Sequence, residues 1–404
     1  MKYLKKFAQH SDYEEFINGG GGVDLPNVSY CENENEVHYN PLIIQPNNEI
    51  WYTSTDNNIV SPYINNSSSA SYNPSGYAYD ENNDKLLILS NTYEDGKGII
   101  KFSGKILGIY DLFKSAITLK TVELPKSLTT IDNESFNNCR SLTSITIPDK
   151  VTEINDGAFL ECTSLTGIAI PDGVTSIGKD AFSGCTSLTG ITIPDSVTSI
   201  GERAFANCSS LTGITISNSV TSIGERAFFQ CNGLTIANLG NNVTSIGNDA
   251  FGQCSSLTGI TIPDSVTSIG YEAFNQCSSL TEIKISNSVT SINEWTFGSC
   301  SSLTGITIPN SVTSIGEYAF GYCEGLTSII IPESVASIED CAFIRRENSL
   351  TASITILRTT PPTLGSSVFN NSNGKIYVPS GSVDTYKSAA NWSNYADIIQ
   401  AIQE

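Results

Sequence analysis

Residues Leu188–Ser210 read LTGITIPDSVTSIGERAFANCSS, and this 23-residue pattern recurs along most of the chain. Nine of the eleven cysteines follow one another at a constant interval, which sets the length of the repeat: Cys139, Cys162, Cys185, Cys208, Cys231, Cys254, Cys277, Cys300 and Cys323. Ten full copies align on them, beginning at Leu119, Leu142, Leu165, Leu188, Leu211, Leu234, Leu257, Leu280, Leu303 and Leu326. A fixed period of this length indicates a solenoid of stacked repeats.

Within the repeat, apolar residues stand at positions 1, 4, 6, 10, 13, 17, 18 and 21. Positions 4 and 6, such as Ile191 and Ile193, alternate with outward residues, which is typical of a short half-buried strand. Gly201 predicts a sharp corner, and Ala204 with Phe205 is expected to fill the far side of the interior. Each repeat therefore predicts one coil, whose apolar residues are sheltered only when coils stack.

The two ends of the repeat array predict caps. Residues 99–118 form a shortened capping coil with Ile109 and Phe113, residues 119–349 hold the ten repeats, and residues 350–404 hold a degenerate last coil and a C-terminal cap. Within this cap, 382–390 reads as a short helix, and Trp392 with Tyr395 is expected to cover the open end.

The first hundred residues have no repeat. Residues 1–60 predict a small β-rich module for docking or attachment, followed by a linker and hairpin at 61–98. Its expected elements are a short helix over Ser11–Ile17, a hairpin within Val28–Tyr39, and a second hairpin that pairs Glu49–Thr55 with Ile59–Tyr63.

Composition narrows the classes of partner. The net charge of −20 disfavours nucleic acid and anionic membrane surfaces, while a divalent cation or a basic protein patch remains open. Apolar residues make up 39% of the chain, which suits a packed interior. The sequence has no run of about 20 apolar residues, so we expect no insertion into a membrane. The basic start Met1–Phe7 is followed at once by polar residues, so we expect no signal peptide here.

The sequence gives little support for a catalytic site. The two histidines, His10 and His38, lie outside the repeats, so the repeats hold no Ser-His or Cys-His pair. The glycines recur with the coil instead of forming a phosphate-binding loop. We expect neither an enzyme nor a cofactor, with an unrecognised carboxylate pair in the N-terminal module as the enzymatic alternative.

Two columns of the repeat could bind a metal. Asp149, Asp172 and Asp195 share one position on consecutive coils, and could hold Ca²⁺ or be solvated edge charges. The nine cysteines that share one repeat position, which we call the cysteine column, could act as a buried apolar filler, form disulfides, or bind a metal. A tetrahedral thiolate site needs ligands that converge from several directions, whereas this column supplies one ligand per coil. Solvated carboxylates and apolar thiols are the simpler interpretations, and we expect no metal site.

Two surfaces are candidates for ligand binding. The first is the outward face of the strands, a flat surface of small residues that includes Thr192, Thr215, Thr261 and Thr307. The second is an aromatic cluster where the repeat departs from its consensus: Trp295 and Tyr318 are one repeat length apart, with Tyr271 and Tyr322 close by. Exposed Trp and Tyr are typical interface anchors, although packing against another chain, cap or loop would also explain them.

The repeat LTxIxIPxSVTSIGxxAFxxC resembles the BspA-type leucine-rich repeat over about 119–356, and the tail with Ile376–Pro379, Tyr386 and Trp392 resembles the cap common in that family. The resemblance implies a β-rich, right-handed leucine-rich-repeat solenoid, a role in adhesion or ligand binding at the surface of gut or oral bacteria, and no conserved catalytic residues. In contrast to the usual family member, we expect neither an export signal nor an anchor from this sequence. Residues 1–41 are also similar to leading segments of some bacteriophage and mobile-element proteins.

The sequence thus predicts a non-enzymatic adhesion or recognition protein that binds a protein or glycan through the repeats. The alternative is a virion or other assembly component, with residues 1–60 docked to an assembly partner and the repeats displayed outward. The cell surface and the virion are the matching locations.

Overall fold

The computed structural model describes residues 45–60, 76–346, 352–370 and 374–403. The helix predicted over Ser11–Ile17 and the hairpin predicted within Val28–Tyr39 lie outside these residues. The chain divides into Met1–Ile44 and Gln45–Glu404, and the description below concerns the second unit.

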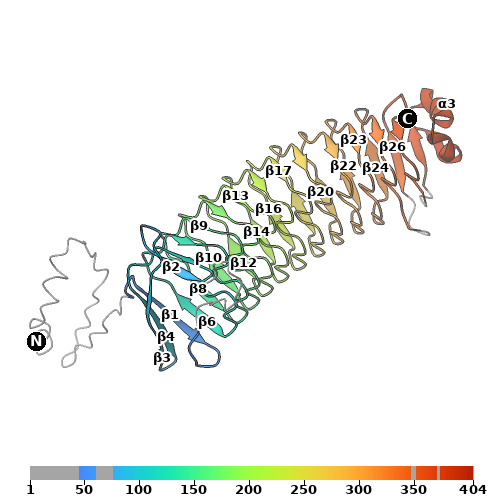
Figure 1. Cartoon of the computed structure of the whole chain (residues 1–404). Helices are drawn as coiled ribbons and strands as arrows, with labels where there is room; N and C mark the ends of the chain where they lie inside the picture. The colour runs from blue at the N-terminus through green and yellow to red at the C-terminus, as the bar shows by residue number, and fades with distance from the viewer. Residues whose placement is uncertain (1–44, 61–75, 347–351, 371–373, 404) are drawn as a thin grey trace, which may run out of the picture. The chain divides into compact units, whose positions relative to one another are not determined.

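Each repeat begins with a short strand whose middle residue points inward. In β12 (Gly190–Thr192), Ile191 is buried and its two neighbours are exposed. Successive strands pair in parallel with a shift of one repeat, so Gly167 of β10 (Gly167–Ala169) lies opposite the first residue of β12. Figure 1 shows these strands following one another along the solenoid. The others in this row are β6 (Leu119–Glu123), β8 (Ser144–Thr146), β14 (Gly213–Thr215), β16 (Ile236–Asn238), β18 (Gly259–Thr261), β20 (Glu282–Lys284), β22 (Gly305–Thr307), β24 (Ser328–Ile331), β26 (Ser353–Ile356), β28 (Ile376–Val378) and β29 (Ile399–Ala401).

A two-residue strand forms the second side of each coil. In β13 (Ser199–Ile200), Ile200 is buried and lies between Ile177 and Ile223 of the adjacent coils. The strands of this second row are also parallel. They are β7 (Thr130–Ile131), β9 (Glu153–Ile154), β11 (Ser176–Ile177), β15 (Ser222–Ile223), β17 (Ser245–Ile246), β19 (Ser268–Ile269), β21 (Ser291–Ile292), β23 (Ser314–Ile315), β25 (Ser337–Ile338) and β27 (Thr363–Leu364).

The third side of the coil has turns instead of a strand. Repeat positions 16 and 20 adopt the left-handed backbone conformation, with φ of 53° at Arg203 and 60° at Asn207. The N–H groups of these two residues donate to the carbonyls of Glu225 and Phe229 in the next coil, each at 2.8 Å. Coil-to-coil hydrogen bonds therefore form on this side as well, which satisfies backbone groups that a buried turn would otherwise leave unpaired.

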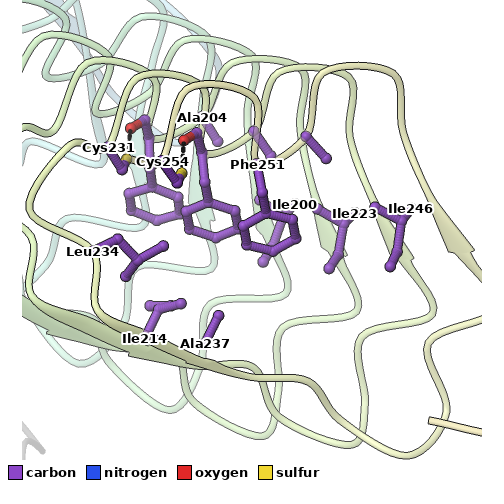
Figure 2. Packing of buried hydrophobic residues seen from close by; sticks show 14 of the residues in the cluster. Ile200, Ala204, Ile214, Ile223, Cys231, Leu234, Ala237, Ile246, Phe251 and Cys254 are labelled. Atoms are coloured by element: carbon purple, nitrogen blue, oxygen red, sulfur yellow. Dashed lines mark hydrogen bonds between the residues drawn. The ribbon is translucent and has the colours of Figure 1, made fainter. Parts of the chain in front are cut away.

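The interior is built around a stack of phenylalanine rings, one from each coil. Phe205 is fully buried between Phe182 and Phe228, with ring centroids 5.3 and 5.4 Å apart and ring planes within 4° of parallel. Figure 2 shows part of this stack at Phe251, with isoleucines of the strands and Leu234 around it. Successive coils shelter one another's apolar side chains, as the repeat pattern predicts.

The segment before the repeats adds strands to the solenoid. β1 (Glu49–Ser54) lies between β4 (Lys97–Phe102) and β6 and pairs antiparallel with both, while β3 (Ile88–Glu94) pairs with the other edge of β4. The predicted hairpin between Glu49–Thr55 and Ile59–Tyr63 is therefore wrong. Both edges of β1 are taken by strands from later in the chain, and this pairing covers the edge that β6 would otherwise expose.

The capping coil before Leu119 joins the same core. β2 (Tyr77–Tyr79) pairs antiparallel with β5 (Gly108–Tyr110), which pairs in parallel with β7 of the first repeat. Phe113 is fully buried and stacks on Phe136 at 5.5 Å, so the phenylalanine stack starts one coil before the first full repeat.

The C-terminal end closes with short helices in the region where the sequence predicts one, over 382–390. Trp392 is 1% exposed, and its Nε1–H donates to the carbonyl of Pro362 at 2.9 Å. Tyr395 meets Phe369, the last phenylalanine of the stack, edge to face at 5.3 Å. The cap comprises η1 (Ser380–Ser382), α3 (Val383–Ser388) and η2 (Trp392–Ile398), followed by β29. Within the described ranges, no helix has the length and apolarity needed to cross a membrane.

Candidate functional sites

We use the term strand face for the outward surface formed by repeat positions 3 and 5 of the first row of strands. Several of its position-3 residues are glycines that the chain's own packing does not require. A Cβ atom added to Gly190, Gly259 or Gly305 would have no atom within 4 Å, whereas one added to the corner residue Gly201 would come within 2.7 Å of the backbone of Gly178. Glycine weakens a strand and often marks a place where something else approaches the backbone.

The candidate threonines all lie on the strand face and are exposed, but this surface is not flat. Thr192 and Thr215 line one groove of about 630 Å³, and Thr261 and Thr307 line a second of about 950 Å³. Ile236 lines both grooves and is 52% exposed. The prediction of a flat face is wrong because a large side chain occupies a position that glycine holds in neighbouring coils, so the surface dips on both sides of it.

The larger recess, which we call the strand-face groove, has apolar ends and a charged middle. Ile236 lies at one end, and Ile330 and Leu357, 57% and 44% exposed, lie at the other. Glu282 and Lys284 stand between them on β20. Sequence reasoning missed these five residues. Four of the five stand on full repeats, at position 3 or 5. The sequence could have identified these four, because each replaces the glycine or threonine that most repeats carry at that position.

The aromatic candidates are only partly brought together. Trp295 and Tyr318 stack with ring centroids 4.3 Å apart and planes within 6°, and Tyr322 lies 6.1 and 6.2 Å from them. The neighbouring Cys341 side chain raises the pKa of Tyr318 to about 12. Tyr271 is 53% exposed and makes no ring contact with the other three in the part of the chain that the structure describes.

Trp295 and Tyr318 stand at repeat position 16, where other coils form side-chain pairs with the coil beside them. At the same repeat position, Arg203 forms an ion pair with Asp180 at 2.8 Å, and Arg226 with Asp249 at 3.0 Å. The stack is therefore the aromatic counterpart of these coil-to-coil pairs. This observation supports packing within the solenoid as one role of these rings.

Beside the stack lies a hollow of about 580 Å³, which we call the aromatic hollow. It extends across four coils and has both aromatic and polar walls. Its lining residues are Glu272, Asn275, Gln276, Trp295, Ser299, Tyr322 and Arg346.

The nine cysteines of the column are buried, free thiols. Each donates a hydrogen bond to the carbonyl of a phenylalanine in the preceding coil, as Cys231 does to Phe205 at 3.1 Å and Cys254 to Phe228 at 3.1 Å (Figure 2). Burial raises the pKa of all nine, for Cys231 to about 12. The thiol thus serves as an apolar filler that also satisfies a backbone carbonyl.

The aspartates considered for Ca²⁺, namely Asp149, Asp172 and Asp195, are all exposed. Among the residues described, no group of three or more His, Cys, Asp and Glu side chains is arranged to hold a metal ion. His10 and His38 lie outside the described ranges.

Several solved structures of bacterial leucine-rich repeat proteins are similar to this chain. A leucine-rich repeat protein from Bacteroides ovatus is 26% identical, with a TM-score of 0.46, over 79% of this chain and 90% of that chain. A leucine-rich cell surface protein from Faecalibacterium prausnitzii is 27% identical, with a TM-score of 0.41, over 83% of this chain and 100% of that chain. The T. pallidum leucine-rich repeat protein is 26% identical, with a TM-score of 0.34, over 54% of this chain and 83% of that chain.

The repeats themselves match one protein family. The family described as a BspA-type leucine-rich repeat region of six copies matches residues 109–235, 152–280 and 230–350, which together span more than half of the chain. No curated protein matches the sequence. The chain belongs to the BspA-type leucine-rich repeat family.

Proposed function

We propose that the protein is a non-enzymatic recognition protein that binds an extended polypeptide in the strand-face groove. The observation that carries the proposal is the set of open glycines: the chain accepts a weaker strand at Gly259 and Gly305 although no atom of its own needs the space. A ligand that lies close to the backbone would use that space. Adhesion at a bacterial surface is the role that the family resemblance implies.

The lining of the groove suits a peptide. From the Ile236 coil to the Leu357 coil there are five strand spacings, roughly 24 Å, which an extended chain spans with about seven residues. The exposed Ile236 and Ile330 offer apolar contacts at the two ends. Between them, Glu282 and Lys284 offer one charge of each sign for polar contacts.

The test is to fill the groove without disturbing the fold. In the variant Gly259→Gln/Gly305→Gln the new side chains project into open space, so we expect stability to be unchanged or to rise by up to about 1 kcal/mol, because glycine is unfavourable inside a strand. A random-peptide display library is selected on the full chain, and the affinity of the selected peptides is measured by calorimetry. We expect the double variant to bind them at least about tenfold more weakly, a loss of roughly 1.4 kcal/mol.

Gly167→Gln is the matched control, because Gly167 is an equally open strand glycine that lines neither groove. It should keep full affinity. A second variant, Ile330→Thr, restores the prevailing residue and should weaken binding by removing an apolar contact. Selected peptides that bind the double glutamine variant as tightly as the wild type would refute the groove as the binding site.

A further inference from the structure

The aromatic hollow exists because one coil interrupts a column of amide side chains. At repeat position 20, four consecutive coils carry Asn207, Gln230, Gln253 and Gln276, and Gln230 donates to Gln253 at 2.8 Å. The next coil carries Ser299. A serine is too short to continue the amide column, so a space opens beside Gln276.

Trp295 forms a wall of this space and is held from two sides. One ring face stacks on Tyr318 at 4.3 Å. The ring also lies over Gly298, where an added Cβ would come within 2.3 Å of the indole. A side chain at residue 298 would displace the indole, so glycine there preserves its position. An aromatic wall held in this way binds a ligand at little cost in conformational entropy.

Several polar side chains line the same hollow. Asn275 is 8% exposed, its Nδ2–H donates to Glu272 at 2.8 Å, and its buried Oδ1 has no partner within the described residues. The side chains of Gln276, Trp295 and Ser299, which also line the hollow, make no hydrogen bond to another residue of the described ranges. Unpaired polar groups that line a concave site are the usual means of orienting a ligand.

The charges in the hollow balance. Glu272 contributes one carboxylate, and Arg346, whose guanidinium lies 5.9 Å from the Tyr322 ring centre, contributes one cation. The lining therefore combines an indole, a phenol, two amides, a hydroxyl and no net charge. A pyranose matches this set: its axial C–H groups fit the electron-rich face of an aromatic ring, and its hydroxyls both donate and accept hydrogen bonds.

We propose that the aromatic hollow is a binding site for a neutral pyranose saccharide. Trp295 supplies the aromatic contact, and Gln276 and Ser299 bind the hydroxyls. The site is separate from the strand-face groove and does not depend on the function proposed for that groove.

The tryptophans of the chain allow a direct test. Of the three, Trp51 and Trp392 are 7% and 1% exposed, so Trp295 dominates the fluorescence that acrylamide can quench. The probes are cellobiose, lactose and N,N′-diacetylchitobiose, each titrated into the full chain. We expect at least one of them to protect Trp295 from quenching in a saturable manner.

Ser299→Gln is the decisive variant, because it restores the residue type that three other coils carry in the same left-handed conformation. The variant should fold normally and bind the protecting saccharide at least about tenfold more weakly. Gln253→Ser is the matched control: it interrupts the amide column away from the aromatic residues and should bind like the wild type.

Three results would overturn the proposal. The first is that none of the saccharides protects Trp295. The second is that Ser299→Gln binds the protecting saccharide as tightly as the wild type. The third is that a charged probe added for comparison, tetramethylammonium or glucuronate, protects Trp295 more strongly than any of the three saccharides, which would assign the hollow to an ion instead of a neutral sugar.

Discussion

Raising the pH from about 8 to about 10 is expected to lower the free energy of unfolding of the solenoid sharply. Burial raises the pKa of Cys231, Cys277 and Cys323 to about 12 from the usual value near 9, and the pKa values of the other six column thiols are raised as well. The unfolded chain therefore loses protons in this range that the folded chain keeps. The free energy of unfolding contributed by these thiols is fully present below about pH 9 and falls as the pH rises toward the folded pKa values.

The size of the effect follows from the number of thiols. Each thiol that stays protonated in the folded chain contributes a loss of roughly 1 kcal/mol between pH 8 and pH 10, so nine together lose on the order of 10 kcal/mol, which is comparable to the whole stability of a typical domain. Urea unfolding followed by circular dichroism at pH 8, 9 and 10 measures this fall.

Tyrosines also titrate near pH 10, so the thiols need a control of their own. The variant Cys231→Ala/Cys254→Ala removes two thiols of the column and should lower the loss between pH 8 and pH 10 by roughly 2 kcal/mol. An equal loss in the variant and the wild type would show that the buried thiols do not cause the alkaline loss of stability.

Phe205→Ala is expected to lower the free energy of unfolding by about 4 kcal/mol. The ring is fully buried between Phe182 and Phe228, and its two neighbours are held in place by their own coils. The coils on both sides therefore cannot collapse to fill the space. Urea unfolding at neutral pH measures the difference, and the cavity left behind adds to the lost burial of the ring.

Thr215→Ala serves as the comparison for this prediction. Thr215 is exposed on the strand face of the next coil, and such a substitution should change stability by no more than about 0.5 kcal/mol. If Phe205→Ala costs no more than Thr215→Ala, the phenylalanine stack does not hold the coils together.

Much of the fold could be predicted from the sequence because the contacts that build it recur once in every repeat. The spacing of Trp295 and Tyr318 already places them on adjacent coils, and the structure brings their rings together. The same holds for the phenylalanine stack and the cysteine column. In a solenoid, a residue's neighbours are its own coil and the two beside it, so position in the repeat determines most contacts.

The candidate sites could be predicted only in part. The sequence identifies the threonines and aromatic residues that face outward and places Gly201 at a corner, but it does not show which strand glycines have open space above them. The strand glycine Gly259 has open space around it, and the corner glycine Gly201 has none. Only the distances to neighbouring coils show that packing requires the glycine at the corner and does not require the one on the strand. The hollow at Ser299 is a similar case, because its depth depends on the side chains of four coils together.

The period, the inward columns and the stacking of the coils follow from the amino-acid pattern alone, since every repeat carries that pattern. The arrangement before the repeats became known only from the folded chain, where β1 pairs with β4 and β6 instead of with Ile59–Tyr63. The pairing of β1 does not recur along the chain, so no repeat pattern predicts it. It depends on which strand edges remain unpaired once the first coil has formed. Hydrogen bonding along those edges connects residues far apart in the chain, such as Thr53 and Thr121, and no local pattern specifies it.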